Sequence, residues 1–326
     1  MPTLPLPVGN CAAGDARPFA LTIYHGQLYA GIICSAESSV TVDTFTDTNA
    51  NGQYDPGDYF IDANLNNIRD AGESYLDING NGSFDAGEAF VDNDGNRTYN
   101  TGNATKLRAY VYTVDQTTLA YSASPVFQMP LNYRRGLKTH ISGAVGIWRP
   151  WSTTYRNSST GVNRTVYAQP MLTDIAFDNG NMILGLRDRV GDQVGNGTPS
   201  NPADVATAQY QPRTAGDVIR ACGSIGTWTV EANGRCGGGG SAPQNVSEGL
   251  GGGEFYYGDA YDLTGDFISP ALNVTGKGSN HDETGSGGVE QLPGAPDVMM
   301  SDFDPIPNIA NMTHDGGIRW LSNFHG

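Results

Sequence analysis

Lysine is nearly missing from this chain of 326 residues, where it occurs only at Lys106, Lys138 and Lys277. Lysine and arginine together number 18 against 34 aspartates and glutamates, which leaves a formal net charge of −16. A protein that binds nucleic acid neutralises phosphates with clustered cations. The composition therefore excludes nucleic acid as an expected partner.

Long apolar runs and common catalytic motifs are also missing. No stretch approaches the ~18 consecutive apolar residues of a membrane-spanning helix. Residues 1–10 lack the charged and apolar regions of a secretory signal peptide. The chain contains no G-x-S-x-G, no H-E-x-x-H, no P-loop and no sialidase Asp-box. We therefore expect no membrane span in this chain, no catalytic residues and no enzymatic activity.

Cysteine is scarce, and its four positions form two local pairs, Cys11 with Cys34 and Cys222 with Cys236. The absence of C-x-x-C argues against a zinc site. Each pair is spaced to close a short loop as a disulfide, and the alternative is four free thiols of a cytosolic protein. Disulfides persist in oxidising compartments, so the pairing favours an extracellular or cell-surface location.

The most regular feature present is an acidic repeat with a constant offset of 15. An aspartate opens each unit, at Asp47, Asp62, Asp77 and Asp92. The units read DTNANGQYDPGDYFI, DANLNNIRDAGESYL, DINGNGSFDAGEAFV and DNDGNRTYNTGN.

Each unit carries oxygen-bearing side chains mostly at relative positions 1, 3, 5, 9 and 12, which is the spacing of an EF-hand calcium loop. Gly52 and Gly82 supply the sharp turn at position 6. Ca²⁺ prefers six to eight oxygen ligands at ~2.3–2.6 Å, and position 7 contributes through its main chain. The predicted metal ligands are Asp47, Asn49, Asn51, Gln53, Asp55, Asp58, Asp62, Asn64, Asn66, Ile68, Asp70, Glu73, Asp77, Asn79, Asn81, Ser83, Asp85, Glu88, Asp92, Asp94 and Asn96.

The units are unequal. Asn67 stands at position 6 of the second unit and is tolerated there, because asparagine visits the left-handed region. Arg97 stands at that position in the fourth unit, where asparagines also replace acids. We expect three Ca²⁺ sites and a fourth that is weak, empty or completed by neighbours. The alternative is a solvated, disordered acidic linker, but apolar pairs close the first three units, and disordered acidic segments lack such a pattern. These pairs are Phe60–Ile61, Tyr75–Leu76 and Phe90–Val91.

The spacing leaves no room for EF-hand helices between the units. The repeat therefore resembles the helix-free calcium repeats of thrombospondin type 3 arrays and of bacterial surface proteins. That resemblance implies structural calcium sites rather than a switch that opens a groove.

A fainter repeat lies outside the acidic units. Residues Leu21–Ile32 match Ile175–Leu186 at a constant offset of 154, and each copy reads as a strand, a tight glycine turn and a second strand. Such a hairpin is typical of a β-propeller blade. Helical periodicity is absent, so we expect few helices. Further strand-like runs are Leu107–Val114, Ala144–Trp148, Asp217–Cys222, Thr227–Glu231, Glu254–Tyr257, Val298–Phe303 and Ile318–Leu321.

These patterns predict an all-β fold, a β-propeller of five to seven blades with an inserted, helix-poor array of calcium loops. The alternatives are a β-sandwich or two tandem sandwiches. We expect an extended N-terminal segment at 1–10 and a propeller at 11–326, interrupted at 43–104 by the calcium repeat. The N-terminal segment is either a linker or a strand added to a neighbouring subunit.

The hairpin stretches 17–38 and 170–195, and the C-terminal HDGGIRWLSNFHG, resemble the propeller region of large bacterial surface proteins of the adhesin type. The resemblance covers most of the chain but consists of strand and turn patterns. It implies a propeller fold and a surface location, and it carries no catalytic residues.

Four weaker clusters have alternative interpretations. Charged residues after the second hairpin either line a channel or form a structural ion-pair network, and the second role is commoner. A later acidic group holds a metal, performs glycosidase chemistry or is a solvated loop. Aromatic residues near position 150 stack on sugars or pack between blades, and packing is the commoner role. His–acid neighbours on a strand point to opposite faces and so do not form a catalytic pair by adjacency. In the same order, the clusters are Arg187, Asp188, Arg189 and Asp192; Glu254, Asp259, Asp262 and Asp266; Trp148, Trp151 and Tyr155; and His281-Asp282-Glu283 with His314-Asp315.

Two functions fit these observations. The first is a calcium-stabilised structural or adhesive surface protein, or the repeating subunit of a surface array or filament, whose partners are copies of itself or other surface proteins. The second is a carbohydrate-binding or carbohydrate-active propeller, a lectin or a glycoside hydrolase or lyase, with glycans as partners. The repeated, in-register acidic pattern favours the first.

Overall fold

The computed structural model describes residues 11–12, 14–38, 44–45, 59–60, 75–76, 83, 90–91, 106–131, 133–137, 145–151, 164–165, 168–193, 211–212, 216–232, 234–235, 250, 254–256, 285–303 and 316–322. In these ranges nearly every regular element is a β-strand, and the one helix is the short α1 (Val190–Gln193). The predicted all-β class and the scarcity of helices are confirmed for this part of the chain.

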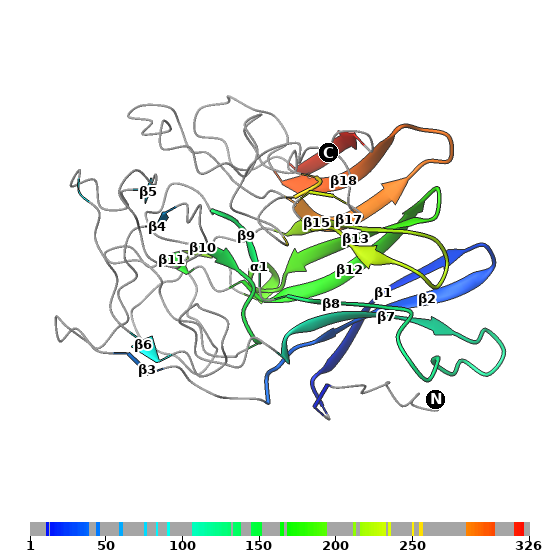
Figure 1. The fold of residues 1–326 in the computed structure, drawn as a ribbon, viewed down its shortest axis with the longest axis horizontal. Coiled ribbons are helices and arrows are strands. Elements are labelled where there is room, and N and C mark those ends of the chain that lie inside the picture. Colours follow the sequence, from blue (N-terminus) through cyan, green and yellow to red (C-terminus); the bar gives the residue numbers. More distant parts are fainter. Residues whose placement is uncertain are drawn as a thin grey trace.

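Three antiparallel sheets dominate the described residues (Figure 1). The first sheet has the order β1 (Ala16–Tyr24), β2 (Gln27–Cys34), β7 (Arg108–Val114) and β8 (Phe127–Pro130). The second sheet has the order β12 (Pro170–Asp178), β13 (Asn181–Asp188), β15 (Asp217–Cys222) and β16 (Thr229–Val230). The third sheet has the order β17 (Gly285–Gln291), β18 (Asp297–Phe303) and β19 (Gly316–Ser322).

The other described strands form two-stranded pairs. β9 (Arg134–Leu137) pairs with β10 (Val145–Ile147), and β11 (Arg164–Thr165) pairs in parallel with β14 (Gln211–Pro212). Within the acidic repeat, β3 (Thr44–Phe45) pairs with β6 (Phe90–Val91), and β4 (Tyr59–Phe60) pairs with β5 (Tyr75–Leu76).

One predicted strand is wrong. The sequence favours an extended segment at Glu254–Tyr257, but Phe255 and Tyr256 lie in a turn. The Phe255 N–H donates to the buried Oε2 of Glu231 at 2.6 Å and not to a neighbouring strand. A buried carboxylate therefore takes the donor that a strand ladder would have used.

The repeat at an offset of 154 is confirmed in structural detail. The strands β1 and β2 coincide with β12 and β13 when their numbers are shifted by that offset. Both hairpins turn through two residues of positive φ, at 48° and 76° for His25-Gly26 and at 49° and 91° for Asn179-Gly180. Positive φ at both turn residues suits the twist of a two-residue hairpin loop and favours asparagine and glycine. Both first strands also carry a bulge at the same place, after Pro18 and after Leu172.

The three sheets pack face to face in chain order. Figure 1 shows the blue and teal first sheet, the green second sheet and the orange third sheet following one another. The first strand of each later sheet lies against the first two strands of the sheet before it: β12 contacts β1 and β2, and β17 contacts β12 and β13. The second sheet is thus buried on both faces.

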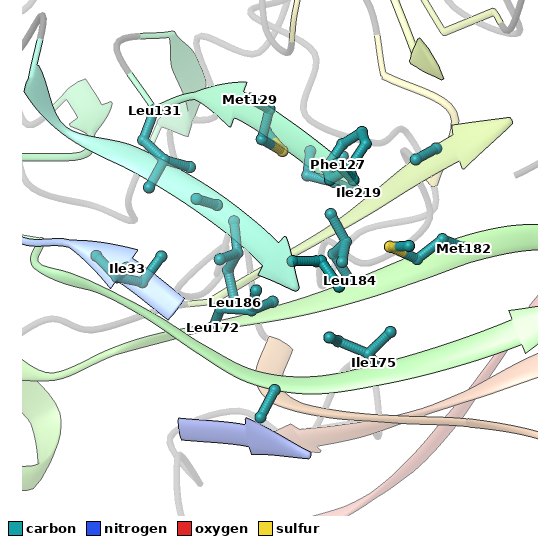
Figure 2. Close-up of a cluster of buried hydrophobic side chains, with 14 of the residues drawn as sticks. Ile33, Phe127, Met129, Leu131, Leu172, Ile175, Met182, Leu184, Leu186 and Ile219 are labelled. Atoms are coloured by element: carbon teal, nitrogen blue, oxygen red, sulfur yellow. The ribbon is translucent and has the colours of Figure 1, made fainter. Parts of the chain in front are cut away.

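Apolar side chains fill the layer between the first two sheets. Ile33 and Met129 of the first sheet and Leu184 of the second point into this layer, as Figure 2 shows. A separate core lies between the second and third sheets, where Ile183 and Val218 meet Met300. Alternate residues of β13 therefore serve different cores, as expected for a strand buried on both faces.

Two equivalent glycines allow the close approach of the sheets. A Cβ on Gly31 would lie 2.6 Å from Cδ2 of Leu172 in β12. A Cβ on Gly185, which is Gly31 shifted by 154, would collide with the main-chain oxygen of Gly287 in β17. Polar contacts reinforce the second interface, because Thr173 Oγ1 donates to the Gly287 carbonyl at 2.8 Å. Each glycine lies under the first strand of the following sheet.

The acidic repeat belongs to the connection between two neighbouring strands. β2 pairs with the whole of β7, from Leu28 opposite Val114 to Cys34 opposite Arg108. The chain between them includes the range 43–104. The hydrogen-bonded sheet therefore places Cys34, before the repeat, opposite Arg108, after it.

Candidate functional site

Short backbone bridges occur within the acidic repeat at the period of the repeat itself. Phe45 pairs with Phe90, and Phe60 pairs with Tyr75, so aromatic residues at the repeat's own spacing provide all four positions. Phe60, Tyr75 and Phe90 belong to the apolar pairs that close the first three units, and Phe45 precedes the first unit. One residue or both of each closing pair thus lie in an antiparallel β-bridge.

Both bridges share one antiparallel register. Phe60 lies 15 residues after Phe45, and Tyr75 lies 15 residues before Phe90. Phe45 pairs with Phe90, and Phe60 pairs with Tyr75, so both bridges follow the same register. The chain reverses between β4 and β5, within the second unit. The first unit separates β3 from β4, and the third unit separates β5 from β6, so the two bridges link the ends of these two units.

Among the predicted calcium ligands, the described residues include only Ser83, which is exposed and lies in a bend. The other predicted ligands between Asp47 and Asn96 lie outside the described residues, so their geometry stays a prediction. Within the part of the chain that the structure describes, no three acidic, histidine or cysteine side chains gather closely enough to hold a metal.

The charged cluster after β13 forms a network of structural contacts. Arg187 donates two hydrogen bonds to the Asp192 carboxylate, from Nε at 2.8 Å and from Nη2 at 2.5 Å. Its third nitrogen, Nη1, donates to the Ser286 carbonyl at 3.0 Å. Asp188 accepts the N–H groups of Gln169 at 3.0 Å and Val190 at 3.1 Å. The cluster thus begins α1 and ties the second sheet to β17.

The aromatic residues near position 150 are buried where the structure describes them, in agreement with the favoured packing role. Trp148 donates its indole N–H to Tyr133 Oη at 3.3 Å, and Trp151 donates to the Pro170 carbonyl at 2.9 Å. Two guanidinium groups lie near the Trp151 ring, that of Arg189 at 4.2 Å and that of Arg17 at 5.3 Å from its centroid. Both indoles are enclosed, which leaves neither ring exposed for stacking on a sugar. Tyr155 lies outside the described residues.

Sequence reasoning missed a buried polar group beside the second sheet. The Tyr133 hydroxyl donates to Oδ2 of Asp217, and both side chains are buried. Burial and the neighbouring carboxylate raise the pKa of Tyr133 well above its usual value. The phenol therefore stays protonated and remains a donor to Asp217. The two residues lie 84 positions apart, so no local pattern links them.

A second buried acid in this region is Glu231. Its Oε1 accepts the Arg220 N–H at 2.8 Å, and its Oε2 accepts the Phe255 N–H at 2.6 Å. Burial raises the pKa of Glu231 to about 8, although both N–H groups oppose that shift. The Arg220 guanidinium lies 4.3 Å from the centroid of the Phe255 ring. Glu231 therefore fastens the 254–256 turn to the second sheet.

Of the predicted acidic group, Glu254 is buried next to this region, and Asp259, Asp262 and Asp266 lie outside the described residues. The two histidine–acid neighbours, at 281–283 and 314–315, also lie outside them. The metal and glycosidase interpretations of these residues stay untested.

The cysteines confirm part of the predicted disulfide pattern. Cys11 and Cys34 form a disulfide with a Cα–Cα distance of 5.5 Å. Cys222 is disulfide-bonded as well. Cys236 lies outside the described residues. None of the described helices is long and apolar enough to cross a membrane.

Relatives of the chain occur in Dictyostelium discoideum. The chain is 29% identical over 229 residues to Colossin-A, an alignment that covers 68% of this chain and 2% of that protein. It is 33% identical over 218 residues to Colossin-B, which covers 63% of this chain and 5% of that protein. The chain thus spans a small fraction of the length of both relatives.

No family model matches the chain, and no solved structure matches it. The names of the two relatives state neither a ligand nor an activity. The resemblance to bacterial surface propellers is tested by neither relative and stays a prediction.

Proposed function

We propose that this protein is a calcium-stabilised extracellular scaffold, structural or adhesive, in which bound Ca²⁺ stiffens the repeat between β2 and β7. Its sheets would be blades of a β-propeller, and the protein would serve as a repeating subunit of a surface array or filament. Other copies of the chain or other surface proteins would be its partners.

The shared period of acids and bridges carries this proposal. The oxygen-rich positions and the bridging aromatics recur with one and the same period along the chain. A bridge at the end of each loop brings the ends of two loops together, which suits a stack of ion-centred loops. The segment 47–103 has eleven acids and two arginines, so without a cation it would repel itself.

The propeller part of the proposal is supported by the arrangement of the three sheets. Each sheet orders its strands in chain sequence and packs against its neighbour, and the first two sheets share one hairpin geometry. Radially packed, up-and-down sheets are the building unit of a propeller. The Cys11–Cys34 disulfide supports an oxidising, extracellular setting.

The test is thermal unfolding with saturating Ca²⁺ and with EDTA. Ions that bind only the folded chain stabilise it by mass action, and we expect Ca²⁺ to raise the Tm by roughly 5–10 °C. Removing two ligands of the third unit, with Asp77→Asn and Glu88→Gln, should reduce that rise. Asp297→Asn, in β18, makes the same kind of charge change outside the repeat and should leave the calcium effect intact. An equal Tm in EDTA and Ca²⁺, together with unchanged proteolysis of the repeat, would refute the proposal.

The carbohydrate-active alternative has less support. Its aromatic platform needs exposed rings, whereas Trp148 and Trp151 are buried and hydrogen-bonded. A glycan array tests this alternative directly, and saturable sugar binding lost in Trp151→Ala would revive it.

A further inference from the structure

The first two sheets repeat one cross-strand pair at their contacts with the following sheet. Gly31 is paired with Val111 in the first sheet, and Gly185 is paired with Val218 in the second. In both sheets the next sheet's first strand covers the glycine, and both valines are buried. A glycine next to a buried valine thus marks the surface that accepts the following sheet.

In the first two sheets, one side accepts the following sheet. The same side of the third sheet faces away from the second sheet, and no residue that the structure describes covers it. Val298 and Met300 face the second sheet, so the alternate residues Met299 and Ser301 face the other way. Ser301 is paired with Ile318, and Met299 with Trp320. Ile318 is 61% exposed and Trp320 is 54% exposed. We call Met299, Ser301, Ile318 and Trp320 the tail face.

The first sheet exposes the outer side of β1, the side that in β12 packs on the preceding sheet. Leu21 and Ile23 point away from the second sheet, and both are 65% exposed. Their counterparts at the offset of 154 are Ile175, which is 2% exposed, and Phe177, which stacks on Tyr24 at 4.2 Å. We call Leu21 and Ile23 the head face. In β12 these two positions pack onto the preceding sheet.

The rest of that side of the first sheet is occupied. Ile32 and Tyr110 are buried there together with Cys11. Among the described strands of this sheet, β1 carries the open part, and β1 is the strand whose equivalents, β12 and β17, cover a preceding sheet. The head face therefore lies on the strand that, in the second and third sheets, makes the contact with the preceding sheet.

We propose that copies of this chain associate head to tail, with β1 of one copy covering the tail face of the next. One molecule leaves exposed the side of its last sheet and the first strand of its first sheet, which are the two parts that its internal contacts between sheets use. In the tail face Ser301 is paired with Ile318, in place of the glycine–valine pair of the internal contacts. Such a heterologous contact closes into a ring or extends into a filament, according to the rotation between copies. The inference rests on the proposed scaffold function for its purpose, but its interface includes no residue of the calcium repeat.

The experiment measures molar mass by sedimentation equilibrium over roughly a hundredfold range of protein concentration. Ile318→Asp inactivates the tail face, and Leu21→Asp inactivates the head face. Ile225→Asp is the matched control, because Ile225 is 56% exposed in the turn between β15 and β16. If an aspartate unfolds the protein, Ile318→Thr and Leu21→Thr make milder polar changes in the same strands.

The proposal expects the mass of the wild type and of the Ile225→Asp control to rise with concentration. Each face variant alone should associate at least about tenfold more weakly, because a charge would be buried at the contact. An equimolar mixture of the two face variants should form a one-to-one pair through the intact head and the intact tail.

A wild type that stays monomeric throughout, or face variants that associate like the wild type, would overturn the proposal. A mixture that stays monomeric would also overturn it, because the intact head of one variant should pair with the intact tail of the other. Symmetrical association through one face predicts instead that one of the two variants associates on its own like the wild type. Every measurement is made in Ca²⁺ and in EDTA, along with the Tm. A missing calcium effect on the Tm refutes the proposed function, whereas failure of the mixture to pair refutes head-to-tail association.

Discussion

Gly31 of β2 and Leu172 of β12 touch so closely that no side chain fits between them. Cδ2 of Leu172 lies 2.6 Å from where a Cβ of Gly31 would be. This contact joins the first sheet to the second, and the equivalent Gly185 joins the second to the third. The spacing of the sheets therefore depends on two glycines at the same position of a structural repeat.

Gly31→Ala should destabilise the protein by about 1–3 kcal/mol, because an added methyl overpacks a filled core. Leu172→Ala alone should cost about 2–5 kcal/mol through the cavity that it leaves. In the double variant the new methyl lies in that cavity, so the double variant should be more stable than the sum of the single effects predicts. Denaturant unfolding of the four proteins measures this coupling, and strict additivity would contradict the contact.

Tyr133→Phe should cost about 2–4 kcal/mol, because it removes the hydroxyl that donates to the buried Asp217 carboxylate. Tyr29→Phe is the matched control, because the buried Tyr29 hydroxyl has no hydrogen-bond partner in the part of the chain that the structure describes. Its loss should be neutral or stabilising. Equal effects of the two substitutions on the free energy of unfolding would contradict the assigned role of Tyr133.

Stability should fall as the pH rises from about 5 to about 8, because of Glu231. Burial raises the pKa of its carboxyl from 4.5 to about 8, so between these values the folded chain holds a proton that the unfolded chain releases. Proton linkage then lowers the free energy of unfolding by roughly 2–3 kcal/mol between pH 5 and pH 7. Above the folded pKa the effect levels off.

Glu231→Gln isolates this contribution, because glutamine keeps an oxygen acceptor but does not titrate. Urea unfolding of both proteins across this pH range, at saturating Ca²⁺, gives the difference directly. The wild type should lose stability relative to the variant as the pH rises. Parallel pH profiles would show that Glu231 does not keep its proton in the folded state.

The sequence alone locates the hairpins well. Asn179-Gly180 and His25-Gly26 are turn residues between alternating strands, and the offset of 154 matches strand bounds that the structure reproduces. These features are local, because two-residue turns fix the register of their own hairpins. The period of the acidic repeat likewise locates the aromatic positions that form the bridges.

Sequence reasoning does not predict the contacts between distant segments. Tyr133 lies in a bend between β8 and β9, Asp217 begins β15, and neither residue type signals that the two side chains meet. In sequence, Trp148 and Trp151 fit a packed core better than a sugar platform without excluding the platform, and their burial decides between the two. The aromatic residues around Phe255 favour a strand, whereas the Phe255 N–H bonds a side chain from 24 positions earlier.

Counting bound calcium by equilibrium dialysis of the purified chain tests the scaffold account most directly. We expect about three Ca²⁺ ions per chain, one for each complete unit of the repeat. The triple variant Asp47→Asn, Asp62→Asn and Asp77→Asn should retain far fewer, while Asp297→Asn should retain the wild-type number. Fewer than about one ion per wild-type chain, at a free calcium concentration that saturates EF-hand loops, would contradict the account.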